Sequence, residues 1–382
     1  MRATLSVAAL RKALVVAVRP VERRTTIPVL ECLHLSVAGG RLHAQGTNLD
    51  VWASSSVLAA DCQKGAICVG RRFVDLVRAL PAFDLITIKA EDGRLVVETP
   101  DGRASFITIP ASDFPEPSKV QAVASFDIAT KDLRSIIERV GRFISTEETR
   151  YYLNGICLTS SGGRDLRFAA TDGHTLGEAT HILPGDLPEA RCIVPRETIA
   201  ALKAIKFDAE QTRVEYLTKS ERPDHVRFTC GDVVVLSKLI DGTFPNYGRV
   251  IPADFASSWE IGRTSWLGAV RRVSILRHNN QSAVLVSADR ANRLSFSVKR
   301  EDFGEMVVAA KGKRLTGQSI EFFCNAELLR EVLSAHHSDP ITLSFKDGNN
   351  PLLFESAQMK TVLMPMRGGF KALELPDDAE AA

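Results

Sequence analysis

The feature that most constrains the fold is a stretch of sequence that occurs three times at domain-sized intervals. It reads LSVAALRKALVVAV from Leu5, IATKDLRSIIERV from Ile128 and IGRTSWLGAVRRV from Ile261, at offsets of 123 and 133 residues. Each copy predicts a short strand, a polar cap and an amphipathic helix with apolar residues four apart. Repetition at this spacing indicates tandem copies of one domain.

Each third of the chain contains a second segment with a helical pattern. These segments are RRFVDLVRAL after Gly70, RETIAALKAIK after Pro195 and NAELLREVLSA after Cys324. Strand patterns surround the helices, and in LITIKAEDGRLVVET the Asp92-Gly93 pair is typical of a hairpin turn. The first two thirds close on a Phe-Pro turn, whereas the last closes on LMPMR.

The sequence therefore predicts an α+β protein of three domains, each with two helices laid on antiparallel sheet. The expected boundaries are 1–122, 123–251 and 252–367, followed by an acidic tail, 368–382, that is expected to be disordered. Tandem copies imply a curved, pseudo-symmetric array. Strand edges exposed at its two ends could pair with a second chain and close a ring.

Composition excludes several classes of protein. No apolar stretch approaches the roughly 18 residues that a membrane helix needs, and the N-terminus lacks the pattern of a signal peptide, so a cytoplasmic protein is expected. The seven cysteines form no CxxC pair, which indicates buried, reduced thiols. His336 and His337 lack a second ligand pair at metal spacing, so neither a metal nor a cofactor is expected.

Charge is separated by structural element although the net charge is only +2. The segments with a helical pattern carry 17 Lys and Arg against 6 Asp and Glu, counted over residues 8–19, 71–79, 131–142, 196–206, 263–273 and 325–335. The rest of the chain carries 31 against 40. Helix propensity alone favours Glu as much as Lys, so it does not explain this bias. The helical face is expected to meet a polyanion through its phosphates, without reading sequence.

Six blocks carry a resemblance to a known family, in order and at matching spacing. They are ERRTTIPVL at Glu22, RYYLNG at Arg150, ATDGHTL at Ala170, IVPR at Ile193, SKLIDGTFPNY at Ser237 and VLMPMR at Val362. Through Arg367 the chain resembles the bacterial DNA polymerase III beta subunit, the DNA sliding clamp. The resemblance implies a head-to-tail homodimer that forms a ring around duplex DNA and holds polymerases on it without catalysis.

The same resemblance implies three sets of site residues. The residues expected to face DNA are Arg24, Arg71, Arg72, Arg150, Tyr151, Tyr152 and Arg196. Those expected to line an apolar cleft for partner peptides are Leu153, Thr171, Gly173, His174, Thr175, Leu176, Pro245, Val250, Val362, Met364, Pro365, Met366 and Arg367. The dimer interface is expected to include Phe106, Ile275 and Leu276. The cleft suits its Met residues, because a flexible thioether can repack around different peptides.

Three departures from the family pattern affect these expectations. Glu197 stands where many relatives carry Lys, so a DNA contact is expected to be missing. Thr175 stands where some relatives carry Arg, which removes a charged donor from the cleft rim. The tail follows the block at which relatives often end, and a sharper hypothesis than disorder is that Phe370, Leu373 and Leu375 fold into the cleft and compete with partners.

The implied partners are double-stranded DNA, a second copy of the chain, the clamp loader, the polymerase III alpha subunit and other polymerases, mismatch-repair proteins and ligase, in a nucleoid-associated location. An enzyme with Asp172 and His174 beside the Ser160-Ser161 pair is disfavoured, because no GxSxG elbow occurs and turn chemistry explains the block. A specialised clamp paralogue or adaptor platform stays open as an alternative.

Overall fold

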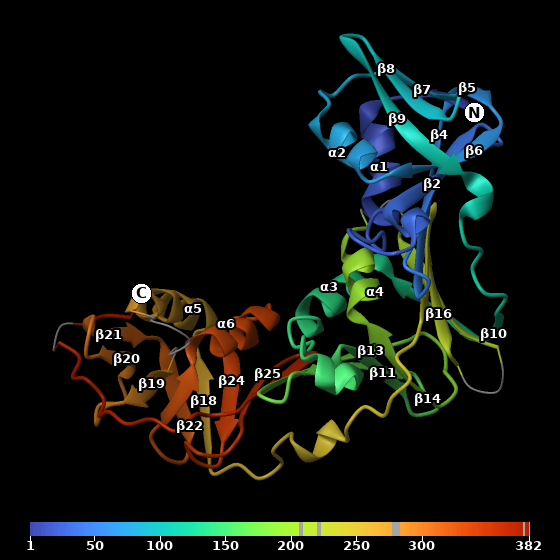
Figure 1. Cartoon of the computed structure of the whole chain (residues 1–382). Coiled ribbons are helices and arrows are strands. Elements are labelled where there is room, and N and C mark those ends of the chain that lie inside the picture. The colour runs from blue at the N-terminus through green and yellow to red at the C-terminus, as the bar shows by residue number, and fades with distance from the viewer. Residues whose placement is uncertain (206–208, 220–222, 277–282, 377–378, 382) are drawn as a thin grey trace. The chain divides into compact units, whose positions relative to one another are not determined.

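The protein is seen in a computed structural model that describes residues 1–382 except 206–208, 220–222, 277–282, 377–378 and 382 (Figure 1). The chain divides into two compact units. The first comprises residues 1–137, 160–164 and 183–241, and the second comprises residues 138–159, 165–182 and 242–382.

The first unit is built on a sheet whose strand order is β10-β15-β16-β17-β4-β3-β2-β6-β9-β8-β7-β1-β5. The strands from the first repeat are β1 (Arg2–Leu5), β2 (Cys32–Ala38), β3 (Arg41–Thr47), β4 (Val51–Leu58), β5 (Ala60–Gln63), β6 (Gly65–Gly70), β7 (Ile86–Glu91), β8 (Arg94–Thr99) and β9 (Gly102–Pro110). Those from the second are β10 (Gln121–Ala129), β15 (Gln211–Thr218), β16 (His225–Cys230) and β17 (Val233–Lys238). Antiparallel pairing of β17 with β4 joins the two repeats in one sheet. This unit also contains β14 (Ala190–Pro195).

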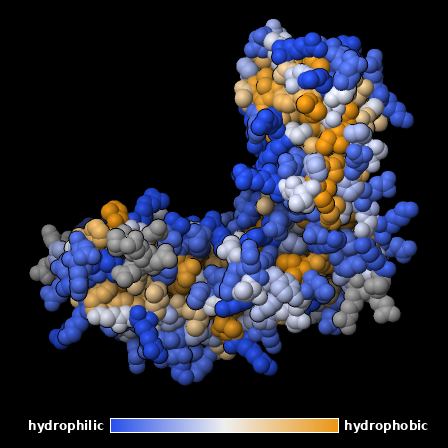
Figure 2. Space-filling model, in the orientation of Figure 1, coloured by the Kyte–Doolittle hydropathy of each residue, from blue (hydrophilic) through white to orange (hydrophobic). Residues whose placement is uncertain are grey.

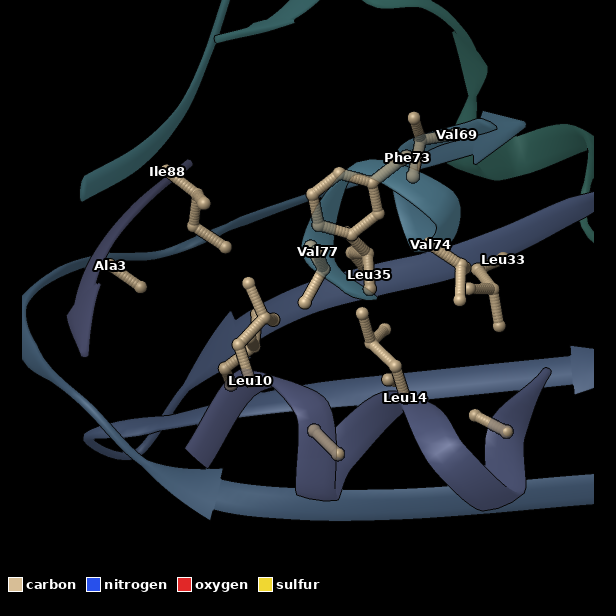
Figure 3. Close-up of a cluster of buried hydrophobic side chains, with 14 of the residues drawn as sticks. Ala3, Leu10, Leu14, Leu33, Leu35, Val69, Phe73, Val74, Val77 and Ile88 are labelled. Carbon is tan, nitrogen blue, oxygen red and sulfur yellow. The ribbon is translucent and has the colours of Figure 1, made fainter. Parts of the chain in front are cut away.

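Helices α1 (Val7–Ala17) and α2 (Arg72–Ala79) pack on the sheet of the first repeat. Ser6 caps α1 by accepting a hydrogen bond from the backbone N–H of Ala9. Figure 3 shows Leu10 and Leu14 of α1 pointing toward Phe73 and Val77 of α2, and all four side chains are buried. Complete burial of each such side chain stabilises the fold by about 1.5–3 kcal/mol. Helix α4 (Arg196–Lys203) belongs to the second repeat.

The second unit contains a sheet with the order β11-β12-β13-β26-β25-β24-β18-β22. The strands are β11 (Gly155–Ser160), β12 (Asp165–Thr171), β13 (Thr175–Ile182), β18 (Ser257–Ile261), β22 (Gly312–Thr316), β24 (Ile341–Phe345), β25 (Leu352–Ser356) and β26 (Met359–Leu363). Antiparallel pairing of β13 with β26 joins the second and third repeats.

A four-stranded sheet of order β21-β20-β19-β23 completes the third repeat. Its strands are β19 (Ala283–Ala288), β20 (Leu294–Arg300), β21 (Gly304–Ala310) and β23 (Glu321–Asn325). Helices α5 (Arg263–Val273) and α6 (Ala326–Ala335) belong to this repeat. Trp266 of α5 packs edge-on against Phe296 of β20, with ring centroids 5.1 Å apart, so α5 covers one face of the sheet.

The predicted repeat is confirmed. A strand leads into a helix in β1-α1, in β10-α3 (Thr130–Val140 for α3) and in β18-α5, and the second helices are α2, α4 and α6. Asp92 and Gly93 both have positive φ, as a two-residue hairpin between β7 and β8 requires. All seven cysteines are free thiols. Among the described residues, no helix is long and apolar enough to cross a membrane.

Candidate functional site

The VLMPM run lies beside the TDGH block. Strand β26 pairs with β13 in a register that places Val362 opposite Leu176 and Leu363 opposite Thr175. Beyond the strand, the N–H of Met364 donates to the carbonyl oxygen of His174 at 2.9 Å. Two segments nearly 190 residues apart in the sequence are thus held together by backbone hydrogen bonds.

Side-chain hydrogen bonds fix the turn between β12 and β13. The Asp172 carboxylate accepts from the N–H of His174 at 2.9 Å and from the N–H and hydroxyl of Thr175 at 2.6 and 2.9 Å. The Thr171 hydroxyl donates to the Thr175 carbonyl at 2.6 Å. Gly173 has a φ of 89°, which favours glycine. The Asp172 carboxylate is therefore engaged in holding the turn.

Thr175 has a structural role at this turn. Its side chain is buried, and its hydroxyl donates to Asp172. From the sequence, Thr175 was expected only to remove the positive charge that Arg gives some relatives at this position. In the structure it also contributes a hydrogen bond that closes the turn.

An apolar cluster underlies the seam between β13 and β26. Leu176, Val362 and Leu353 of β25 are buried together, and half-buried Tyr247 and Ile251 pack against them. Tyr247 lies in η4 (Tyr247–Arg249), and its hydroxyl is hydrogen-bonded to Glu178. Burial, followed by the charge and hydrogen bond of Glu178, raises the pKa of this hydroxyl.

Exposed apolar groups lie at the ends of the same segments. Pro245, Val250 and Met366 are exposed, and Met364 and Pro365 are half-buried. We call these five residues, with the cluster Leu176, Leu353, Val362, Tyr247 and Ile251, the peptide surface, after the partner peptides that the sequence resemblance led us to expect here. The sequence prediction did not include Leu353, Tyr247 and Ile251, although Tyr247 closes the SKLIDGTFPNY block.

Leu153, Arg150 and the two tyrosines come from η3 (Glu148–Leu153). Leu153 is buried, and Arg150 forms an ion pair with Glu147 at 3.3 Å and lies against Gly173. The rings of Tyr151 and Tyr152 meet edge-on, with centroids 5.9 Å apart. This segment, expected to face DNA, thus also touches the turn between β12 and β13.

Comparisons with known proteins agree along the chain. Models of the N-terminal, central and C-terminal domains of the DNA polymerase III beta subunit match residues 1–118, 127–246 and 248–367. The chain belongs to the bacterial DNA polymerase III beta subunit family. It is a sliding clamp, a non-catalytic processivity factor that tethers polymerases during DNA replication, and homodimeric rings are typical of its family.

Individual relatives match this clamp over nearly their whole length. The beta sliding clamp of Caulobacter vibrioides is 33% identical over 377 residues, which cover 96% of this chain and 100% of the relative. The beta sliding clamp of Vibrio cholerae is 31% identical over 350 residues, which cover 90% of this chain and 93% of the relative. The DnaN sliding clamp of Bartonella birtlesii bound to griselimycin has a TM-score of 0.86 and 29% identity, with 96% and 100% covered. The C. crescentus clamp with polyethylene glycol at a putative β-motif tethering region also has a TM-score of 0.86, with 32% identity and 96% and 99% covered.

The clamp carries an arginine cluster in its first repeat, formed by Arg19, Arg23, Arg71 and Arg78. The guanidinium of Arg71 donates to the carbonyl of Val21 at 3.0 Å. Burial, and then the neighbouring charges of Arg23, Arg78 and Arg19, lower its pKa. The like charges add to the effect of burial because they disfavour the charged form of Arg71, whereas Asp75 acts in the opposite direction. Arg24 and Arg72 are exposed.

Two basic side chains of the helical segments, Arg11 and Arg196, form bonds within the clamp itself. Arg11 donates to the carbonyls of Val77, Arg78 and Leu80, which satisfies the C-terminal end of α2. Arg196 forms an ion pair with Glu197 at 2.9 Å. The Glu197 departure therefore partly neutralises one of the residues expected to face DNA.

The residues expected at the dimer interface differ in exposure. Ile275 lies in η5 (Ser274–Leu276) with 74% of its surface exposed, and Leu276 is half-buried. Phe106 instead turns toward the core of its own repeat and meets Phe73 edge-on at 5.9 Å. Its neighbour Ile107 is 76% exposed, because adjacent residues of a strand face opposite sides. Ile107 is thus the more exposed apolar residue of β9.

Proposed function

We propose that partner proteins dock short apolar peptides on the peptide surface. The observation that carries this proposal is the pairing of β13 with β26, which brings the TDGH turn and the Val362–Met366 run together over one apolar cluster. On the face shown in Figure 2, separate apolar patches stand out among side chains that are largely hydrophilic. A mostly apolar site with few polar groups is typical of peptide recognition.

The site is suited to weak, exchangeable binding. Burial of one large apolar side chain of a peptide contributes about 1.5–3 kcal/mol, so two such anchors contribute about 3–6 kcal/mol. This is no more than the lower part of the roughly 4–15 kcal/mol that association costs in entropy. Unbranched Met364 and Met366 can adopt different rotamers for different partners. One site can thereby serve polymerases, the clamp loader, mismatch-repair proteins and ligase in turn.

Griselimycin, the ligand named for two clamps of known structure, is the probe for this site. Titration calorimetry of the full chain should show binding, and Val250→Glu should weaken it by about tenfold or more, since a charge would replace an apolar side chain. Val123→Glu is the matched control, because Val123 is exposed to a similar extent, 52% against 45%, but lies in β10. Equal losses in the two variants would contradict the assignment.

We further propose that the helical segments face duplex DNA. Support comes from their excess of Lys and Arg and from the arginine cluster around Arg71. Arg24, Arg72, Arg150 and Arg196 would contact phosphates, and the rings of Tyr151 and Tyr152 would contact sugars, so binding would be independent of sequence.

Ring closure is proposed to join β9 of one chain to the end of α5 in another. Between Gly102 and Ile107, the pairing that the structure describes for β9 is with β8 alone, which leaves that stretch of edge available to a partner strand. Ile107, Ile275 and Leu276 would add apolar contact there, with Phe106 supporting the strand from its inner face.

The specialised paralogue or adaptor remains the second candidate. It is motivated by the altered rim at Thr175 and by the tail after Arg367. A replicative clamp would be found at the nucleoid in the cytoplasm, and its depletion should arrest DNA synthesis. Continued synthesis after depletion would favour the adaptor.

A further inference from the structure

The last residues of the chain lie beyond the part that matches the beta-subunit family, which ends at residue 367. The described tail residues form neither helix nor strand. Contacts with the four-stranded sheet of the third repeat or its flanking residue Arg293 are made by Gly368, Phe370, Leu373 and Pro376. The hypothesis that Phe370, Leu373 and Leu375 fill the peptide surface is not what the structure describes. Disorder of the tail in solution remains a prediction.

The tail first contacts the sheet at Phe323 of β23. The ring of Phe370 meets it edge-on, with centroids 5.0 Å apart at 86°. Gly368 approaches the same ring so closely that an added Cβ would lie 2.1 Å from it. Glycine is therefore required at position 368 if the chain is to pass over Phe323.

Further along, the tail continues onto β20. The N–H of Leu373 donates to the hydroxyl of Ser297 at 3.3 Å, and the guanidinium of Arg293 donates to the carbonyl of Pro376 at 3.2 Å. The large apolar side chains of the tail are more buried than their neighbours. Phe370, Leu373 and Leu375 are half-buried, and Lys371, Ala372, Glu374 and Pro376 are exposed.

Sheet register shows that these contacts share one face. Leu285 of β19 is opposite Phe323 on one side and opposite Ser297 on the other. Residues directly opposite in antiparallel strands point to the same face, so these three form a row across the sheet. The neighbouring residue Phe296 packs on Trp266 of α5 and therefore faces the other way. The tail follows the row on the face opposite α5.

Phe323 also holds the peptide surface. The N–H of Met366 donates to the carbonyl oxygen of Phe323 at 2.7 Å, in an isolated bridge. The same residue thus binds the end of the VLMPM run through its backbone and the tail through its ring. Three residues separate Met366 from Phe370, so the two contacts with Phe323 restrain the same short stretch of chain.

We propose that the tail is an intramolecular strap that docks on the row Phe323, Leu285 and Ser297 and fixes Met364–Arg367 in the geometry that receives a peptide. This proposal rests on the proposed role of the peptide surface. If Met364–Arg367 are already held in place, they lose less conformational entropy when a peptide binds, so the strap strengthens binding. A competing tail would weaken it.

The test compares the full chain with a chain ending at Arg367, with Phe370→Ala and with Lys371→Ala. Lys371 is the matched control, because its side chain is exposed in the same tail. Griselimycin binding should weaken by about two- to tenfold in the truncation and in Phe370→Ala, and should be unchanged in Lys371→Ala. Hydrogen exchange of the Met366 amide should quicken in the first two variants only.

The outcomes separate the strap from the proposed function. Unchanged or tighter griselimycin binding after truncation overturns the strap, and so does unchanged exchange at Met366. If the full chain does not bind griselimycin, the proposed peptide surface fails as its site. The docking of the tail then stands or falls on the exchange rates alone.

Discussion

His336 lies 2.9 Å from the hydroxyl of Thr361, with its other ring nitrogen 2.8 Å from the hydroxyl of Ser356. Its side chain is completely buried at the C-terminal end of α6. One imidazole thus ties α6 to β25 and to β26, whose next residue, Val362, belongs to the peptide surface. Burial, and then the charges of Arg139, Arg263 and His337, lower the pKa of His336 to about 3.

This relationship predicts a pH-dependent stability. Since the folded-state pKa lies below the ordinary value of 6.5, the unfolded chain binds the proton first, and the contribution of His336 is complete above pH 6.5. The contribution falls by about 1.4 kcal/mol per pH unit as the pH drops toward 3.

His336→Phe should lower the free energy of unfolding by about 2–4 kcal/mol at pH 7.5, because two buried hydroxyls lose a partner. At pH 4.5 the deficit should be about 2–3 kcal/mol smaller, since the variant has no proton to take up at this position. Urea unfolding at both pH values measures this. Val332→Ala, a buried change in α6 without a titrating group, should give a deficit that does not vary with pH; the same behaviour from His336→Phe would refute the linkage.

Thr175→Val should destabilise the TDGH turn. It removes the hydroxyl that donates to Asp172 and is expected to cost about 1–2 kcal/mol, because the acceptor is charged and the site is buried. Griselimycin binding should weaken with it. Thr149→Val removes a similar bond to Glu147 at an exposed position and should change stability by less than about 0.5 kcal/mol. Equal effects in urea unfolding would mean that the turn is not held by this hydroxyl.

Leu276→Lys should convert the dimer to monomers, because a charge would replace an apolar group at the proposed interface. Sedimentation velocity at micromolar concentration measures the change. Leu315→Lys is the control, since Leu315 is also apolar and partly exposed but lies in β22. A Leu276→Lys chain that still sediments as a dimer would show that the interface lies elsewhere.

Glu197→Lys should strengthen DNA binding. The change frees Arg196 from its ion pair and adds one cation. The slope of log affinity against log salt should steepen by about 0.9 for each additional phosphate that the clamp neutralises. Glu116→Lys makes the same charge change at an exposed position outside the helices. If both variants respond alike, net charge alone is responsible.

Retention on nicked circular DNA tests the ring itself. After loading, the clamp should stay on the circle at salt high enough to screen phosphate contacts, and should be lost once the circle is cut. Retention that ignores the cut would identify a groove binder instead of a ring.

Local and periodic patterns were sufficient for much of this protein. The three copies of strand and helix follow from apolar spacing, and the Asp92-Gly93 turn follows from residues that accept positive φ. These properties depend on neighbours in sequence, so they can be read from the sequence alone. The charge excess of the helical segments was visible for the same reason.

Tertiary structure decided which residues meet. Only the register of β13 with β26 places His174 beside Met364, and only the packing of β9 turns Phe106 inward and leaves Ile107 outside. The contacts of the acidic tail are of the same kind, since its half-buried residues follow a row formed by three separate strands. Contacts of this kind depend on the relative placement of distant strands, which no local pattern encodes.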